Sequence, residues 1–476
     1  MKRRSFLKLS GATAFAAATQ ARARNSGEAM NPNVLIVMTD QQFADAMSCV
    51  MGNEYISTPN LDALAKSGTR FTRAYTPNPL CLPMRTSMIT GQYPHRTGVV
   101  NNAAEPIDPD QFSFLGKLFQ DAGYETAYFG KWHVAFDKDR KDVHGFDVFM
   151  EKEARLDPEP AARFLRKNHE RPFLAVASFL GPHEICQWAR KEKLPGEQLG
   201  DPPPLGERPP MKTNSDPPAN ETDIMTHMRK SFQAHRLFPV GDYTEADWRR
   251  LSWGYYRLIE RVDRFIGTVL AALKASGKEK DTVVLFLSDH GECHGAHRWN
   301  QKTVFYDEST RVPFILQWRG KILSGTSRVL VNTGIDVLPT LCDLAGIHLP
   351  SDLPGKSLKA QAMGLEPDWK RDYVVCQNHM VQCEPVDGKF VQPHGRMVRS
   401  ARYKYCLYSE GDRRESLVDM DEDPGEMRNQ ANHPAFKDIL KRHRGYLREH
   451  AVQHRDRLAI EMLRCVDTEL AQSNNG

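Results

Sequence analysis

Short apolar segments that end in a polar residue recur along this chain and alternate with amphipathic helical segments. The two clearest are residues 33–39, followed by Asp40, and residues 282–288, followed by Asp289. Other segments with the composition of buried strands are residues 124–129, 173–180 and 312–318. Helical patterns occupy residues 59–67, 112–122, 248–275 and 335–345. Because fully apolar strands need cover on both faces, this alternation predicts an α/β fold with a mostly parallel sheet flanked by helices.

The character of the chain changes after residue 370. Short strand patterns appear at residues 373–376, 397–400 and 403–408, and a charged helix is predicted over residues 434–455. We therefore expect a main domain over residues 31–370 and a smaller C-terminal α+β subdomain over residues 371–476, with a small antiparallel sheet and a helix. Residues 191–222 are rich in Pro, Gly and charge, which predicts a long irregular insertion, either a substrate-facing loop or a flexible excursion.

The first residues resemble an export signal. Lys2, Arg3 and Arg4 precede a mildly apolar, Ala-rich run over residues 9–18, and a small-residue pattern ends at Ala23. Residues 1–23 are therefore predicted to be a signal of the twin-arginine type, and the mature protein to be periplasmic or secreted. A basic tail or a membrane anchor is the alternative, but the run is too short to span a bilayer. No other stretch is long and apolar enough, so no membrane span is expected.

Charge and cysteine content argue against a nucleic-acid partner and against a zinc ribbon. The formal net charge is only +4 over 476 residues, with no basic run in the body of the chain, so no nucleic-acid partner is expected. The nine cysteines include no CxxC pair, which argues against a zinc ribbon. Export permits disulfides, and Cys376 and Cys383 are close enough in the chain to pair.

Polar residues follow two of the predicted strands directly. Asp40 and Gln41 end the first strand, and Asp289 and His290 end a later one. Ligands of open α/β sheets bind outside the carboxyl ends of the strands. Oxygen-rich ligands converging there would hold a hard divalent cation, with Ca²⁺ favoured. Loop hydrogen bonding is the better explanation for any one of these residues alone, but the matching positions on two strands favour a metal site.

Cys81 lies at the start of a predicted helix that Gly91 ends. Pro83 suits the first turn, and Arg85 lies one turn further on the same side as Cys81. A helix N-terminus favours negative charge, so a thiolate nucleophile would be stabilised there. A buried structural cysteine is the alternative for a single Cys.

Basic side chains follow further strands. Lys131 and His133 are two residues apart on an extended segment, so both can grip one anion. His183 follows a Gly-Pro pair at another strand end, and Lys302 follows a loop rich in His and Gly. Taken singly, each is more often an ordinary polar residue. Together with the acidic strand ends they predict a pocket for an anionic substrate.

With these features, the chain resembles the sulfatase family, within the alkaline-phosphatase-like superfamily of metal-dependent hydrolases. The resemblance rests on the order and spacing of several segments. These are residues 31–40, 58–62, 90–98, 130–133, 288–292, 311–313 and 421–426. It implies that residues 31–370 form a sulfatase catalytic domain and that the enzyme hydrolyses sulfate esters.

The resemblance also implies a modified nucleophile. Cys81, Pro83 and Arg85 match the family pattern Cys-x-Pro-x-Arg, in which a maturation enzyme oxidises the cysteine to formylglycine. Met84 stands where a small residue is usual. In the implied cation site, Gln41 replaces the second usual acid, and residue 81 itself is a further ligand.

The family mechanism assigns the remaining roles. One hydroxyl of the hydrated formylglycine would attack sulfur, and Lys131, Lys302 and the cation would offset charge on the sulfate oxygens. His183 would protonate the departing alcohol, and His133 would act as base when the aldehyde re-forms. Arg85 would hold the diol. The cation site implied is Asp40, Gln41, residue 81, Asp289 and His290, where His290 replaces the Asn of many relatives, and Mg²⁺ or Mn²⁺ are alternatives to Ca²⁺.

Three interpretations stay open at the level of sequence. The first is a sulfatase acting on a small sulfated molecule or, by analogy with other exported sulfatases, a sulfated carbohydrate. The second is a phosphodiester or phosphonate monoester hydrolase of the same superfamily. The third is a catalytically silent binder of sulfated glycans, which would follow if Met84 prevents conversion of Cys81.

Overall fold

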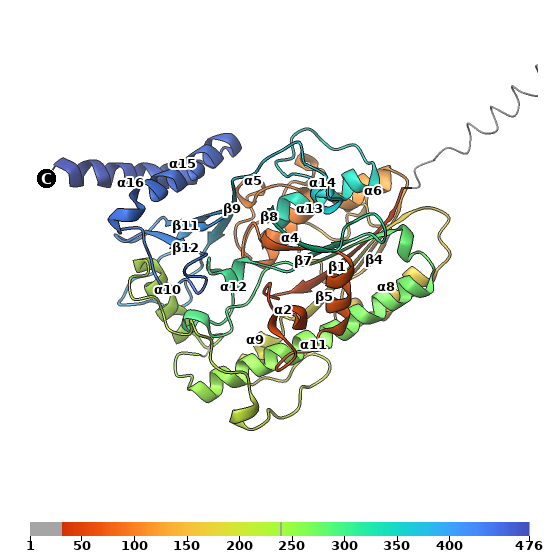
Figure 1. The fold of residues 1–476 in the computed structure, drawn as a ribbon, viewed down its shortest axis with the longest axis horizontal. Helices are drawn as coiled ribbons and strands as arrows, with labels where there is room; N and C mark the ends of the chain where they lie inside the picture. Colours follow the sequence, from red (N-terminus) through yellow and green to blue (C-terminus); the bar gives the residue numbers. More distant parts are fainter. Residues whose placement is uncertain (1–30, 239, 476) are drawn as a thin grey trace, which may run out of the picture.

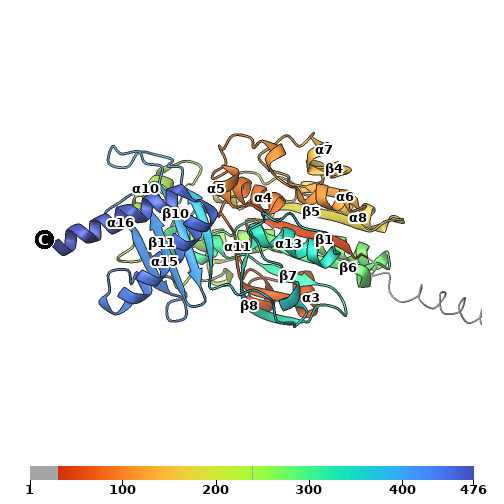
Figure 2. The ribbon, with the colours of Figure 1, turned by 90° about the horizontal axis from the view of Figure 1, so that it is seen from above.

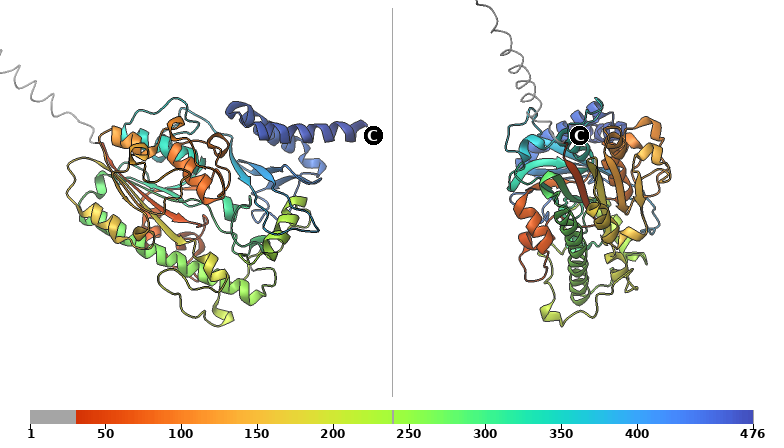
Figure 3. Two further views of the ribbon diagram at one scale, coloured as in Figure 1. Left: turned by 180° about the vertical axis from the view of Figure 1, so that it is seen from behind. Right: turned by 90° about the vertical axis from the view of Figure 1, so that its right-hand side faces the viewer.

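The computed structural model describes residues 31–238 and 240–475, so the predicted export signal lies outside the described residues. The first described residues and the C-terminal end of the chain lie at opposite ends of the molecule (Figure 3). In the described part of the chain, no helix is both long and apolar enough to cross a bilayer. The nine cysteines, all within that part, are free thiols, so Cys376 and Cys383 do not pair.

The larger sheet has eight strands in the order β4-β3-β5-β1-β6-β7-β2-β8. Its strands are β1 (Asn33–Asp40), β2 (Thr69–Tyr75), β3 (Glu125–Gly130), β4 (Val148–Met150), β5 (Phe173–Pro182), β6 (Thr282–Ser288), β7 (Phe314–Gln317) and β8 (Gly325–Asn332). Only β7 runs antiparallel to its neighbours, and every other pair is parallel. The predicted mostly parallel α/β sheet is confirmed, although β2, β4 and β8 were not predicted.

Strand β1 explains why helices cover both faces. Its eight residues are all buried, and successive side chains point to opposite faces of a sheet. Val34, Ile36 and Met38 belong to one hydrophobic core, and Leu35 and Val37 belong to another on the other face. A continuous apolar strand of this kind needs two helical layers.

The two helical layers come from different parts of the chain (Figures 1 and 2). One core takes side chains from α4 (Cys81–Thr90), α6 (Leu115–Asp121) and α13 (Thr333–Ala345). The other takes them from α3 (Pro59–Ser67), α8 (Glu159–Arg166) and the long α11 (Glu245–Ala275). Helix α11 begins with a capping box between Thr244 and Asp247, which satisfies donors at its first turn.

The C-terminal region forms a second, antiparallel sheet beside the first (Figure 2). Its strands are β9 (Tyr373–His379), β10 (His394–Ser400), β11 (Tyr403–Tyr408) and β12 (Glu415–Asp419), of which β12 was not predicted. The smaller α+β subdomain is thereby confirmed, while the boundary at residue 370 stays a prediction. The charged helix predicted over residues 434–455 is confirmed as α15 (Lys437–His454), which ends at Arg455, whose φ is 58°. It is not the last helix, because α16 (Arg457–Asn475) follows it.

The remaining elements are short. The other helices are α2 (Ser48–Met51), α5 (Pro94–Thr97), α7 (Lys141–His144), α9 (Ile185–Ala189), α10 (Asp223–Ala234), α12 (Asp307–Thr310) and α14 (Lys359–Ala362). Single 3-10 turns are η1 (Pro109–Gln111), η2 (Glu153–Arg155), η3 (Leu205–Glu207), η4 (Glu279–Asp281), η5 (Ala296–Arg298) and η6 (Pro434–Phe436). The predicted irregular insertion, residues 191–222, contains only η3.

Candidate active site

The adjacent central strands β1 and β6 bring two carboxylates together. The strands are parallel and in register, with Thr39 opposite Ser288, so Asp40 and Asp289 leave the sheet at the same edge. Both side chains are fully buried. The backbone N–H of Gln41 donates to Asp289 Oδ1 at 3.0 Å, which holds Gln41 at a φ of 71°, a conformation that non-glycine residues rarely adopt.

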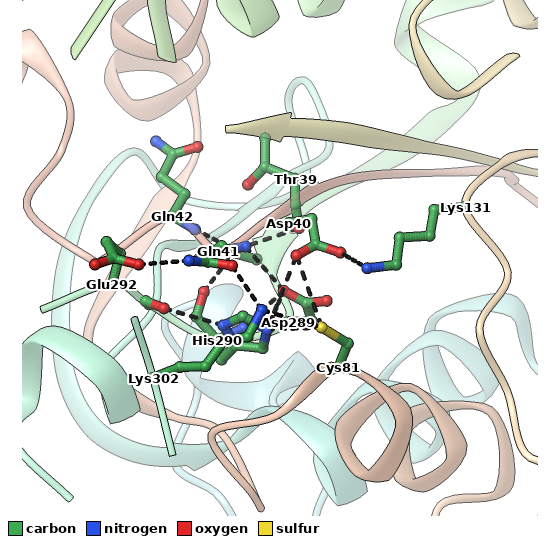
Figure 4. Close-up of polar contacts among 12 residues, drawn as sticks. Thr39, Asp40, Gln41, Gln42, Cys81, Lys131, Asp289, His290, Glu292 and Lys302 are labelled. Atoms are coloured by element: carbon green, nitrogen blue, oxygen red, sulfur yellow. Dashed lines mark hydrogen bonds and ion pairs between the residues drawn. The ribbon is translucent and has the colours of Figure 1, made fainter. Parts of the chain in front are cut away.

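Cys81 is the first residue of α4, and its side chain reaches the same place (Figure 4). Its Sγ lies 3.1 Å from His290 Nε2 and 3.9 Å from Asp40 Oδ1. Gly91, at a φ of 68°, ends the helix as predicted. In a chain whose Cys81 has been oxidised to formylglycine, Sγ marks where the oxygen of the new side chain would lie.

These side chains form a group that fits a divalent cation. Ligand atoms of Asp40, Cys81, Asp289 and His290 all lie within 4.8 Å of one another, and all four residues are buried. Carboxylate oxygens suit hard cations such as Ca²⁺ and Mg²⁺, and an imidazole nitrogen is acceptable to several metals. A thiolate is a soft ligand, so an oxygen at residue 81 would suit such a cation better. The donor set therefore fits a hard cation together with an oxidised residue 81.

Arg85 ties the two carboxylates to the sheet. Its guanidinium donates to Asp289 Oδ2 at 2.8 Å and to Asp40 Oδ2 at 3.1 Å. It also donates to the backbone oxygen of Lys131 and to the hydroxyl of Ser178, both at 2.8 Å. Burial alone would lower the pKa of Arg85, but the two carboxylates outweigh it and raise that pKa, so the side chain is a fixed cation.

Two lysines place further positive charge beside Cys81. Lys131 Nζ contacts Asp40 Oδ2, and Lys302 Nζ lies 3.4 Å from Cys81 Sγ. Burial alone would raise the pKa of the Cys81 thiol, but Lys131, Lys302 and His290 together lower it well below its usual value. Burial alone would likewise lower the pKa of Lys302, and nearby thiol and carboxylate groups raise it instead. The pocket therefore stabilises an anion at residue 81.

His133 and His183 lie at the more open side of this group. Both are partly exposed, unlike the buried residues around them, and both interact with Cys81. His133 Nδ1 is buried without a hydrogen-bond partner among the described residues. Burial and then Lys302 lower the pKa of His183 below its ordinary value. Every residue predicted for the site thus lies in one cluster around Cys81, except that Gln41 contacts it through Lys302, whose Nζ donates to Gln41 Oε1 at 2.6 Å.

The structure adds residues that sequence reasoning did not assign. Ser178 on β5 supports Arg85, and Glu292 accepts a hydrogen bond from Gln41 Nε2. The thiol of Cys186 lies 3.0 Å from Gln301 Nε2, close behind Gln41. Only Glu292 stood in a recognised segment, and nothing local in the sequence indicated that any of them would reach the site.

Comparison with known proteins identifies the family. The family profile described as Sulfatase matches residues 32–347, which include every residue of the cluster. The profile described as N-sulphoglucosamine sulphohydrolase, C-terminal, matches residues 295–453. The chain belongs to the sulfatase family. The sequence-based predictions of the family, of an enzyme and of a sulfuric ester hydrolase are therefore confirmed.

Relatives of this sulfatase resemble it over most of their length. A Δ4,5-hexuronate-2-O-sulfatase of Bacteroides thetaiotaomicron is 31% identical over 89% of this chain and 90% of its own. An ulvan-active sulfatase of Formosa agariphila is 30% identical over 87% of this chain and 79% of its own. A solved structure of a 2-O GAG sulfatase superimposes with a TM-score of 0.77 at 30% identity, covering 90% of this chain and 93% of that one.

Met84, the unusual residue of the sulfatase motif, is fully buried in a hydrophobic core. It packs with side chains such as Met38 and Met88. No hydrogen bond or ion pair of the described site involves its side chain. The larger side chain is thus accommodated by the core beneath α4.

Proposed function

We propose that this sulfatase releases sulfate from a sulfated glycan through a formylglycine made from Cys81, with one divalent cation, Ca²⁺ in the first instance. The observation that carries the proposal is the convergence of Asp40, Cys81, Asp289 and His290 within 4.8 Å. Hydrated formylglycine supplies a hydroxyl nucleophile at residue 81, and a bound cation polarises it and the sulfate oxygens.

The proposed cation ligands are Asp40, Gln41, Asp289, His290 and the oxidised side chain of residue 81. The buried carboxylates need compensating charge, because an isolated buried charge is costly. Arg85 and Lys131 provide part of it through their contacts with Asp40. Burial alone would raise the pKa of Asp40, but these and other cations lower it, so its carboxylate stays ionised and ready to bind a metal.

The other side chains bind the anion and handle protons. Lys131 and Lys302 lie beside residue 81 and would stabilise charge on the sulfate oxygens. Arg85 holds Asp40 and Asp289 and keeps the site in shape. His183 would donate a proton to the leaving alcohol, and His133 would accept one at residue 81 when sulfate leaves. Their partial exposure suits both roles, because the substrate must reach residue 81 from the open side.

The named activities of the relatives suggest the substrate. The relative from Bacteroides thetaiotaomicron is a hexuronate 2-O-sulfatase, and the solved structure is of a 2-O GAG sulfatase. We propose a sulfated, uronate-containing oligosaccharide, with the 2-O position first. A panel of oligosaccharides with single 2-O, 4-O, 6-O or N-sulfates, with released sulfate measured, tests this. Turnover confined to a position other than 2-O would contradict the assignment of position.

A chemical comparison tests the reaction itself. Sulfate, phosphodiester and phosphonate esters of one aryl alcohol are offered to the wild-type enzyme and to Cys81→Ala. We expect the wild type to hydrolyse the sulfate ester fastest and the variant to hydrolyse none of them. A clear preference for the phosphodiester or phosphonate would favour the other hydrolases of the superfamily.

Two further proposals concern the maturation of Cys81 and its order relative to export. Conversion of Cys81 by a formylglycine-generating enzyme is tested by mass spectrometry of the Cys81 peptide after coexpression. Only unmodified thiol would favour a catalytically silent glycan binder. A twin-arginine signal carries a folded protein, so conversion should precede export. A cytoplasmic precursor that keeps the thiol, beside a converted exported protein, would overturn that order.

A further inference from the structure

The side-chain amide of Gln41 lies between groups of opposite charge (Figure 4). Its Nε2 donates to Glu292 Oε2, and its Oε1 accepts from Lys302 Nζ at 2.6 Å. All three side chains are buried. Gln41 and Glu292 are 251 positions apart in the sequence, so only the fold brings them into contact.

The two charged partners decide which way the amide points. Turning a glutamine amide by 180° exchanges its oxygen and nitrogen with almost no change in shape. A lysine ammonium can only donate and an ionised carboxylate can only accept, so one orientation satisfies both partners and the other satisfies neither. The oxygen of Gln41 therefore lies on the side of Lys302, whose Nζ is 3.4 Å from Cys81 Sγ.

Glu292 is itself held in place from the other side. Its Oε1 accepts from the backbone N–H of His294 at 3.1 Å and from the backbone N–H of Gln301. The side chain is 1% exposed, and each of its three hydrogen-bonding contacts is with a donor. This is the surrounding that an acceptor-only carboxylate needs when it is buried.

We propose that Glu292 is a positioning residue that turns the amide oxygen of Gln41 toward the cation. Glu292 does not bind the cation itself. It acts through Gln41, because only the oxygen end of an amide coordinates a hard cation. The inference rests on the proposed function, since it needs a cation at this site.

Glu292→Gln is the most informative single change, because it keeps size and removes the charge. If the new amide turns its oxygen toward the backbone donors of His294 and Gln301, it presents NH₂ to Gln41. Gln41 must then either lose this hydrogen bond or rotate and present its own NH₂ to the cation site. Residues that orient metal ligands in this way typically contribute 10- to 100-fold to affinity, so we expect the Kd for Ca²⁺ to rise by about that factor.

A swap of the two residues should reverse the effect. In the double variant Gln41→Glu with Glu292→Gln, residue 292 accepts from both backbone donors and donates from its NH₂ to a carboxylate at residue 41. The second oxygen of that carboxylate then faces Lys302 and the cation. Every hydrogen bond is satisfied again, so affinity for Ca²⁺ should return to the wild-type value or exceed it.

The test measures binding of Ca²⁺ alone by calorimetry, on full-length protein stripped with a chelator. The matched control is Glu308→Gln, because Glu308 accepts from Asn214 Nδ2 at 2.8 Å and does not contact Gln41. We expect weaker binding in Glu292→Gln, recovery in the swap and wild-type binding in the control. Unchanged affinity in Glu292→Gln, or a swap that does not recover it, would overturn the inference alone. A wild type that binds neither Ca²⁺, Mg²⁺ nor Mn²⁺ would instead overturn the proposed cation and this inference with it.

Discussion

Replacing Lys302 by Met should separate the electrostatic role of this side chain from the shape of the pocket. Methionine has nearly the same length as lysine but no charge. Because Lys302 is only 6% exposed, the change removes a buried positive charge and keeps the volume of the side chain. Three cationic side chains lie in the site. Arg85 contacts both Asp40 and Asp289, Lys131 contacts Asp40, and Lys302 lies beside Cys81. Removing one of the three alters the charge that a sulfate group meets.

The size of the effect follows from the distance. Lys302 Nζ lies 3.4 Å from the Sγ that marks the proposed nucleophile. At an effective dielectric constant of about 20, a full unit charge at that distance interacts with the ammonium by about 5 kcal/mol. Only part of a charge develops on approach to the transition state, so about 3–4 kcal/mol is expected. This agrees with the 10²- to 10³-fold loss that follows removal of one preorganised stabilising group from an active site.

The assay compares kcat/KM for an aryl sulfate in Lys302→Met, in the wild type and in the control Lys138→Met. Lys138 is a partly exposed lysine that pairs with Glu151 at 3.3 Å. Rates are divided by the fraction of residue 81 present as formylglycine, measured by mass spectrometry, so that incomplete maturation is not mistaken for lost catalysis. We expect a loss of about 10²- to 10³-fold only in Lys302→Met. A loss of less than about threefold would refute the assigned role.

Three further results are expected. Stripping the protein with a chelator should abolish turnover and lower its unfolding temperature. Ca²⁺ at about 100 times its Kd should restore about 2.7 kcal/mol of stability. An unfolding temperature that does not change when Ca²⁺ is added would contradict the cation site. Asp456→Ala should lower the free energy of unfolding, measured in urea, by about 3–5 kcal/mol. The reason is that the buried Arg396 guanidinium loses the carboxylate that accepts from it at 2.6 and 2.9 Å. A change below about 1 kcal/mol would show the pair to be dispensable. Burial, helped by His95, lowers the pKa of His454 from 6.5 to about 4, so the unfolded chain binds this proton first and stability should fall as the pH drops from 6.5 to about 4. When the unfolding temperature is measured against pH, His454→Gln should make its decrease toward low pH less steep. An unaltered slope would argue against this role of His454.

Much of the candidate site could be predicted because its signals are local. The strands at residues 33–39 and 282–288 are continuous apolar runs, and the residues directly after them are Asp40 and Asp289. Parallel pairing of such strands brings their carboxyl ends together, so two carboxylates at matching positions were expected to meet. Cys81 could be assigned to a helix start because Pro83 and Gly91 mark the two ends of α4.

The less apolar strands and the last helix could not be read in this way. Strand β2 alternates buried and partly exposed residues, and β8 begins with exposed ones, so their sequences look like loops until their partners are known. The predicted helix ends at residue 455, where α15 ends, but the further helix α16 was not predicted. Tertiary packing, rather than local propensity, decides the conformation at such positions.

By itself, the sequence determined the kind of sheet, the family and the residues proposed to carry the chemistry, because hydrophobic periodicity and short motifs act over a few residues. Only the tertiary structure decided which distant side chains support them. Ser178 reaches Arg85 across 93 positions, and Glu292 reaches Gln41 across 251. Such contacts leave no mark in the local pattern, because a hydrogen bond depends on positions in space that the whole fold must first bring together.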